Sequence, residues 1–185
     1  MKILLLPHGR SGSSSLQFAL SDALNLEKII EPFNWDLWAN YYKGTPSYQG
    51  GDIPNNTIIK NLVGQNDKWV NQYSNQFDKI ILLARDNIRD TMISAQNAQV
   101  YGYSNYYTPT EELTTEVMDY VSSSYFYLLE FNNTLEDSKL IWYDDIYVNY
   151  DLSKETIKSL ELNITDEQFD KMWNKYLNPK FRLRR

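Results

Sequence analysis

The chain has 185 residues, of which 42% are hydrophobic and 23% charged, with a formal charge of −6, no cysteine and one histidine, His8. This balance predicts a single globular domain over residues 1–185 and excludes disulfides, thiolate chemistry and a metal centre built from several imidazoles. The negative charge, the short N-terminal apolar run and the absence of any run of about 20 apolar residues predict a cytoplasmic protein with no nucleic-acid or membrane partner.

The first predicted element is a strand at Lys2–Leu6, followed by a Gly/Ser-rich loop and a helix at Ser13–Leu24. Small residues and the N-terminus of a helix together form an anion cradle, and Arg10 adds a fixed positive charge. An ordinary strand–helix turn capped by serine is the alternative. The loop lacks the lysine and the glycine spacing of a Walker loop, and its second glycine is misplaced for the GxSxG turn of serine hydrolases.

Further strands and helices alternate along the chain. Strands are predicted at Lys28–Ile30, Thr57–Lys60, Lys79–Ala84 and Lys139–Tyr143, and helices at 87–99, 111–135 and 166–176, the last capped by Thr165. The strands are almost continuously apolar, which is typical of strands covered on both faces. The pattern predicts an α/β protein, a three-layer α/β/α fold with a central, mainly parallel sheet. Residues 43–56 and 101–109 are predicted lids or binding loops.

A second polar site is indicated where the fourth predicted strand ends. Arg85 follows this strand, and Ser94 lies seven residues beyond Asn87, roughly 10 Å along a helix. The two side chains can share a ligand only if this helix crosses the site. Alternatively, Arg85 forms an ion pair with an acid such as Asp86, and Ser94 is an ordinary helix residue.

The two stretches together resemble the PAPS-dependent sulfotransferases, which use 3′-phosphoadenosine-5′-phosphosulfate (PAPS) as donor. The family's first signature, a basic residue followed by Ser-Gly and two hydroxyl residues, is similar to Arg10-Ser11-Gly12-Ser13-Ser14, with Arg in place of the commoner Lys as in some bacterial members. Its second signature, a strand-terminal Arg and a later Ser, is similar to Arg85 and Ser94. Shorter similarities occur around Glu31, Lys60 and Tyr143, so that the resemblance spans residues 2 to about 146.

The resemblance implies a P-loop NTPase-like sulfotransferase fold and a role for each motif. Backbone N–H groups of residues 11–14 would bind the 5′-phosphosulfate, and Arg10 would neutralise the bridging oxygen as its bond to sulfur breaks. Arg85 and Ser94 would bind the 3′-phosphate, and Tyr143 would belong to the same donor site. Sulfuryl transfer by this route is in-line and needs no metal, so none is expected.

The base that would accept the proton of the acceptor hydroxyl is less clearly indicated. Cytosolic members of the family use a histidine two residues after the lysine that aligns with Lys60, but this chain has Leu62 there. Glu31 occupies the place of the glutamate base of other branches, although it can equally cap or pair locally. His8 is the rival base, with a structural role or a donor role near the phosphosulfate as alternatives. Lys60 would stabilise the transferring group or be a solvated lysine.

A group of aromatic residues is the only indication of the acceptor. Alternatively, these residues belong to the hydrophobic core. They are Trp35, Trp38, Tyr41, Tyr42 and Tyr48. Aromatic faces suit a small-molecule, glycan or phenolic acceptor. The basic tail, residues 180–185, either reaches the 3′-phosphate or is solvated. Two other functions stay open: a kinase-like nucleotide phosphotransferase with a degenerate P-loop, which the missing Walker lysine disfavours, and a non-catalytic nucleotide-binding module.

Overall fold

The computed structural model describes residues 1–34, 48, 50–101 and 112–179. Its strands are β1 (Lys2–Pro7), β2 (Glu27–Ile30), β3 (Thr57–Lys60), β4 (Lys79–Ala84) and β5 (Ser138–Trp142). Its helices are α1 (Ser13–Leu24), α3 (Asp67–Tyr73), η2 (Ser74–Gln76), α4 (Ile88–Tyr101), α5 (Thr115–Thr134), α6 (Tyr143–Tyr147), α7 (Tyr150–Ser159), α8 (Asp166–Met172) and the π-helical η3 (Trp173–Leu177).

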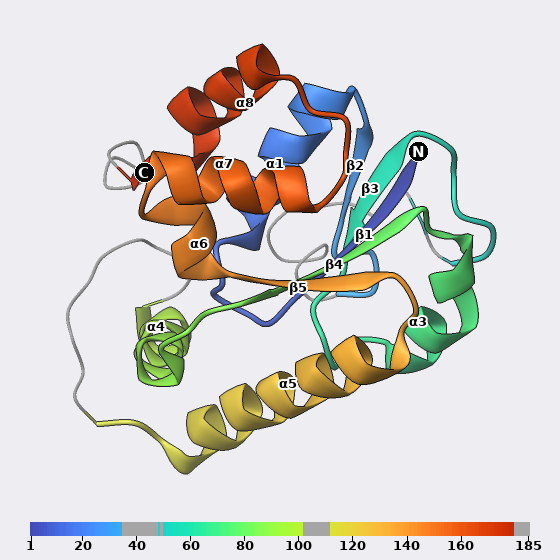
Figure 1. Cartoon of the computed structure of the whole chain (residues 1–185). Coiled ribbons are helices and arrows are strands. Elements are labelled where there is room, and N and C mark those ends of the chain that lie inside the picture. Colours follow the sequence, from blue (N-terminus) through green and yellow to red (C-terminus); the bar gives the residue numbers. More distant parts are fainter. Residues whose placement is uncertain (35–47, 49, 102–111, 180–185) are drawn as a thin grey trace.

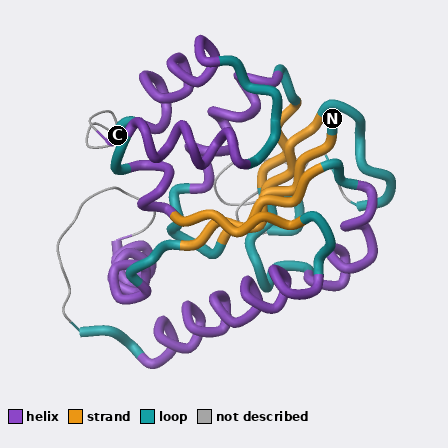
Figure 2. The backbone as a smooth tube through the Cα atoms, in the orientation of Figure 1, coloured by secondary structure: helices purple, strands orange, loops and turns teal. Residues whose placement is uncertain are grey.

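The five strands form one sheet in the order β2-β3-β1-β4-β5, and every pairing is parallel. The strands lie side by side through the middle of the molecule (Figure 2). All four residues of β3 are buried, as are five of the six residues in each of β1 and β4. This accounts for their continuous apolar sequence, because a strand covered on both faces has no solvated side.

Two helical layers cover the sheet (Figure 1). On one face, α1, α6, α7, α8 and η3 pack on Ile3 and Leu5. On the other, α3 and α5 pack on Leu4 and Leu6. The predicted three-layer α/β/α fold with a parallel sheet is therefore confirmed. In the described part of the chain, no helix combines the length and apolarity needed to cross a bilayer.

The sequence placed all five strands within one residue at either end, and it placed α1 at its observed bounds. The predicted last helix is divided, since α8 passes into π-helical turns at Trp173. Its capping residue is confirmed, because the Thr165 hydroxyl accepts a hydrogen bond from the Gln168 N–H. The helices α3, η2, α6 and α7 were missed, and Tyr143 begins α6 instead of ending a strand. Of the predicted long loops, residues 43–47, 49 and 102–109 lie outside the described residues, and the described part of 43–56 has no helix or strand.

Candidate functional site

The predicted site residues gather at the carboxyl edge of the parallel sheet. Leu5 of β1 pairs with Lys60, the last residue of β3, and Pro7 pairs with Leu83 near the end of β4. The loop after β1 therefore lies between the ends of β3 and β4. In open α/β sheets, ligands bind at this edge. The topology thus brings the first loop, Lys60 and Arg85 to one place.

The first loop turns into α1 through two residues in left-handed conformation. Arg10 has φ 66° and Gly12 has φ 77°. Gly12 is the N-cap of α1 and provides no side-chain cap, while Ser15 N–H donates to the Gly12 carbonyl. First-turn N–H groups have no partner within a helix, so those of α1 are suited to an anion.

The side chains of this loop are held mainly by internal contacts. The Ser11 hydroxyl is buried and donates to the His8 carbonyl at 2.9 Å. The Tyr147 hydroxyl donates to the Gly12 carbonyl at 2.7 Å. A Cβ on Gly9 would approach the Tyr120 hydroxyl to 3.0 Å, so the aromatic ring leaves little space beyond glycine there. In this arrangement, Ser11 supports the loop, and its backbone N–H is the group suited to a ligand.

His8 is wholly buried, and both of its ring nitrogens have backbone partners. Nε2 accepts a hydrogen bond from the Arg85 N–H at 2.8 Å, so the ring proton lies on Nδ1, which donates to the Gly9 carbonyl at 2.6 Å. The ring also stacks on Tyr125, with centroids 4.6 Å apart. Burial lowers the pKa of His8 to about 4, with a smaller lowering by the Arg85 charge. This geometry favours the structural role over that of base.

Arg10 joins the first motif to the second. Its Nε donates to the Ser94 Oγ at 3.0 Å, although the two residues are 84 positions apart. Ser94 lies in α4 and is 8% exposed, while Arg10 is exposed. Helix α4 therefore crosses the edge beside the first loop, which was the condition for Arg85 and Ser94 to share a ligand.

Arg85 is half-buried, and its guanidinium lies over an aromatic ring instead of an acid. Its central carbon is 4.7 Å from the centroid of the Tyr143 ring. The Tyr125 hydroxyl donates to the Arg85 carbonyl and fixes the backbone. Among the described residues, Arg85 takes part in no ion pair. Its charge is therefore available to an anionic ligand, with Tyr143 as a support.

Acidic side chains lie near Arg85. Burial raises the pKa of Asp86, and the neighbouring carboxylates of Asp144 and Asp145 raise it further. Three carboxyl groups thus share this side of the edge and reduce the positive potential around Arg85. In the described residues, no cluster of three or more His, Cys, Asp or Glu is arranged to hold a metal ion.

Lys60 and Glu31 form a buried ion pair beside the first loop. Lys60 Nζ lies 2.8 Å from Glu31 Oε1, and the two side chains are 4% and 10% exposed. The same ammonium donates to Ser14 Oγ, in the first turn of α1, at 3.0 Å. Glu31 Oε2 accepts from Asn34 Nδ2 at 3.0 Å and from Gln65 Nε2 at 3.2 Å. Lys60 is therefore not the solvated lysine that the sequence left as an alternative.

The charge of Lys60 decides the state of Glu31. Burial raises the pKa of Glu31, but the ion pair with Lys60 and the bonds from Asn34 and Gln65 outweigh burial and hold the pKa below 4.5. The carboxylate is ionised at neutral pH and fixed in place. As long as Lys60 stays against it, this carboxylate is a weak base.

Sequence reasoning missed the residues that support the site. Tyr125, Tyr147, Asn34 and Gln65 have no motif of their own, and they reach the site from α5, α6 and two loops. The available signal for Tyr125 was a tyrosine-rich helix in a stretch without Lys or Arg, between Arg89 and Lys139. This signal does not say whether the tyrosines pack in the core or face a ligand.

The predicted acceptor aromatics are described in part. Tyr48 is 6% exposed and packs against Phe33 and Trp69, and it donates to the Gly51 carbonyl, so it belongs to the core. Trp35, Trp38, Tyr41 and Tyr42 lie outside the described residues, as does the basic tail at 180–185. The core alternative thus holds for Tyr48.

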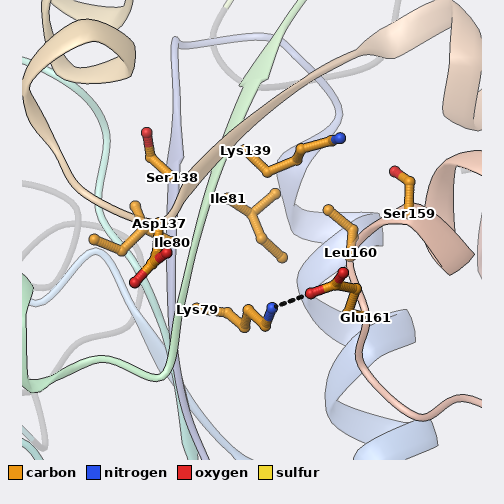
Figure 3. A pocket seen from close by; sticks show the side chains of 9 residues that line it. All are labelled: Lys79, Ile80, Ile81, Asp137, Ser138, Lys139, Ser159, Leu160 and Glu161. Carbon is orange, nitrogen blue, oxygen red and sulfur yellow. Dashed lines mark hydrogen bonds and ion pairs between the residues drawn. The ribbon is translucent and has the colours of Figure 1, made fainter.

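A small cavity of about 210 Å³ lies at the opposite, amino edge of the sheet (Figure 3). It is lined by Lys79, Ile80, Ile81, Asp137, Ser138, Lys139, Ser159, Leu160 and Glu161. Lys79 is neutralised by Glu161 at 3.0 Å. This cavity does not include any predicted site residue.

No protein-family model and no curated protein matches the sequence. Among solved structures, the chain is similar to a shikimate kinase from Bacteroides thetaiotaomicron, with 13% identity, a TM-score of 0.54, and coverage of 88% of this chain and 97% of the kinase. It is similar to mouse sulfotransferase SULT7A1 complexed with PAP, with 16% identity, a TM-score of 0.57, and coverage of 95% and 63%. It is also similar to YorR from Bacillus subtilis in complex with phosphorylated GDP, with 14% identity, a TM-score of 0.50, and coverage of 88% and 96%.

These similarities establish a P-loop-like fold. The chain spans about two thirds of the length of the sulfotransferase and nearly the whole length of the two other proteins. Transferases of both chemistries share this fold, and a fold does not select between them. The choice depends on the residues at the carboxyl edge.

Proposed function

We propose that this protein is a sulfotransferase that transfers the sulfuryl group of PAPS to the hydroxyl or amine of an acceptor. The observation that carries the proposal is the bond from Arg10 Nε to Ser94 Oγ. It joins two sequence motifs, each weak alone, in the one arrangement that lets them serve a single ligand. The PAP complex of the sulfotransferase SULT7A1, which has a similar fold, adds support.

Two anionic groups of the donor would bind on either side of the Arg10–Ser94 contact. The 5′-phosphosulfate would lie against the N–H groups of residues 11–14, with Arg10 and Lys60 as cations. The 3′-phosphate would take Arg85 and Ser94 as partners, with the Tyr143 ring holding the guanidinium in place. A ligand with two separated anionic groups uses both cation sets, whereas ATP has no 3′-phosphate for Arg85.

The chemistry that this site would perform is mostly positioning and charge stabilisation. The transferring sulfuryl group is planar and electron-poor, with the attacking and leaving oxygens in line, much as in phosphoryl transfer. Arg10 would stabilise the charge on the leaving phosphate, and Lys60 the charge on the transferring group. Glu31 would accept the acceptor's proton. The acceptor is a small molecule, a glycan or a phenol.

A kinase-like phosphotransferase is the second candidate function. Shikimate kinase and YorR match this chain over nearly their entire lengths, which fits the size of a small-molecule or nucleotide kinase. The loop has no Walker lysine, but Lys60 brings an ammonium to Ser14 from a neighbouring strand. A nucleotide-binding module without catalytic activity would retain the same contacts.

Ligand stabilisation separates these functions. A bound ligand raises the free energy of unfolding by about 2.7 kcal/mol at a concentration of 100 Kd. We expect adenosine 3′,5′-bisphosphate to stabilise the protein more than ADP or ATP with magnesium. We expect Arg85→Ala to weaken the effect by about tenfold in affinity, because a charged donor to phosphate is lost. Thermal shift titration measures both.

Arg89→Ala is the matched control, since Arg89 is an exposed arginine four residues away, on α4. Its affinity for the bisphosphate should equal that of the wild type. A preference for ATP with magnesium, unaffected by Arg85→Ala, would favour the kinase. Bisphosphate binding without sulfuryl transfer to any acceptor or to water would favour the non-catalytic module.

A further inference from the structure

The buried pair of Lys60 and Glu31 has a feature that a purely structural ion pair lacks: its cation also contacts the surface suited to an anion. Lys60 Nζ is 2.8 Å from Glu31 Oε1 and 3.0 Å from Ser14 Oγ. Lys60 is buried, whereas Ser14 is exposed. An atom that accepts a hydrogen bond from Ser14 Oγ therefore lies within about 6 Å of the same ammonium.

Glu31 is held by partners that do not depend on Lys60. The amides of Asn34, in the loop after β2, and Gln65, in the loop after β3, donate to Oε2, while Lys60 contacts Oε1. In the described part of the chain, Lys60 is the ionised group placed against Glu31, and the other two partners are neutral. If the ammonium turned toward another anion, the carboxylate would keep its two amide hydrogen bonds and lose the positive charge that Lys60 places against it.

We propose that Lys60 is a shared cation that passes from Glu31 to the donor when the donor binds, so that Glu31 becomes an effective base only once the donor is in place. This inference rests on the proposed sulfuryl-transfer function. It assigns regulation to the pair: the free protein holds a neutralised carboxylate, and the donor releases that carboxylate for proton abstraction.

The resulting step is balanced. The acceptor oxygen forms a bond to sulfur while its proton passes to the Glu31 carboxylate. The bond between sulfur and the bridging oxygen breaks, and its electron pair leaves with adenosine 3′,5′-bisphosphate. Nothing is oxidised or reduced. Lys60, now against the transferring oxygens, would stabilise their charge in the transition state.

Proton uptake on binding tests the exchange. Removing the Lys60 charge from Glu31 and adding the negative charge of the ligand both raise the pKa of the carboxyl group, so binding should take up protons. We would titrate adenosine 3′,5′-bisphosphate into the wild type and Glu31→Gln at about pH 5, by calorimetry in two buffers of different ionisation enthalpy. Protons released or taken up by the ligand phosphates are common to both proteins and cancel in the difference.

We expect the wild type to take up at least about 0.3 proton more per ligand than Glu31→Gln. We also expect Glu31→Gln to bind the bisphosphate about tenfold more tightly, because Lys60 is no longer neutralised. Glu27→Gln is the matched control: Glu27 is an exposed residue at the start of β2. It should behave as the wild type in both measurements.

Equal proton uptake in the wild type and Glu31→Gln would overturn the exchange while leaving the proposed function intact. Failure of the wild type to bind the bisphosphate would overturn the proposed function and the exchange with it. If Glu31→Gln does not fold, carbon-13 titration of the Glu31 carboxyl in the wild type gives the same answer. Its midpoint should rise when the bisphosphate saturates the protein, and an unchanged midpoint would contradict the proposal.

Discussion

His8 couples the protonation state of one buried ring to the stability of the protein. Its pKa is lowered from 6.5 to about 4 in the folded state, chiefly by burial. The unfolded chain therefore binds more protons than the folded chain between these values, and stability falls as the pH falls through that window. A shift of this size corresponds to a loss of about 3 kcal/mol between pH 7 and pH 4.

Because the sequence has one histidine, a loss of stability that comes from histidine protonation in this pH range can be assigned to His8. We expect the free energy of unfolding, measured by urea titration, to decrease from pH 7 to pH 5 in the wild type. His8→Gln keeps an acceptor for the Arg85 N–H but does not titrate, so its stability should change less over the same range. Parallel curves for the two proteins would show that folding does not lower the pKa of His8.

Arg10 and Glu31 both have left-handed backbone conformations, with φ 66° and 41°. Such conformations are unfavourable for residues with long side chains, and they persist only where the surrounding contacts fix them. Most other residues of this kind here are Asn or Asp, which adopt the conformation more readily. Among the described residues the exceptions are Arg10, Glu31 and Glu161. Arg10 and Glu31 are proposed site residues, whereas Glu161 pairs with Lys79 at the opposite edge of the sheet, so this conformation does not by itself mark the site.

At the scale of one element, the entry into α1 requires glycine. Gly12 has φ 77° and its carbonyl accepts from Tyr147. We expect Gly12→Ala to lower the free energy of unfolding by about 1–2 kcal/mol, because a Cβ is unfavourable in this conformation. We also expect weaker bisphosphate binding, since the cradle N–H groups would shift. Urea unfolding and calorimetry measure the two effects.

Gly51→Ala is the control that separates the backbone strain of an added Cβ from a direct effect on bisphosphate binding. Gly51 has φ 98°, and a Cβ there would meet no atom within 4 Å. Its stability should fall by a similar amount, while its affinity for the bisphosphate stays at the wild-type value. If both variants lost affinity equally, the effect of Gly12→Ala would reflect general destabilisation instead of the loop.

Across the whole molecule, the central strand is buried on both faces. Leu4 packs with α3 and α5, and Leu5 with α1 and the C-terminal helices, and both are 0% exposed. We expect Leu4→Ala and Leu5→Ala each to destabilise the protein by 2–5 kcal/mol, measured by urea unfolding, since each removes core contacts and leaves a cavity of roughly the same size.

A similar loss of stability at two consecutive residues is expected only for a sheet that is covered on both faces. In a sheet with one solvated face, only every second residue of a strand would lose stability on substitution by alanine. A large effect at one position and an effect below about 1 kcal/mol at its neighbour would contradict the two-layer arrangement.

The sequence by itself determined the strands, the first helix and the α/β class. Continuous apolar runs at Ile3–Leu6 and Ile80–Ala84 have no polar face to expose, and they are short enough only for buried strands. The Gly/Ser loop and Arg85 were visible as candidates because small residues before a helix and an arginine at a strand end suit an anion. An ordinary turn and an ion pair were the alternatives that the sequence left open. Short helices such as α6 and α7 were missed, because five and ten residues give too few turns for a helical repeat to be recognised from the sequence.

Only the tertiary structure decided how these residues combine. The strand order places β3 and β4 on either side of β1, and this brings Lys60, Arg85 and the first loop to one edge although they are 25 to 75 residues apart in sequence. Whether Lys60 is solvated or paired with Glu31, and whether His8 is a base or a support, depends on burial and on the partners that packing provides. Local sequence does not encode those contacts, because each joins elements that meet only when the sheet forms.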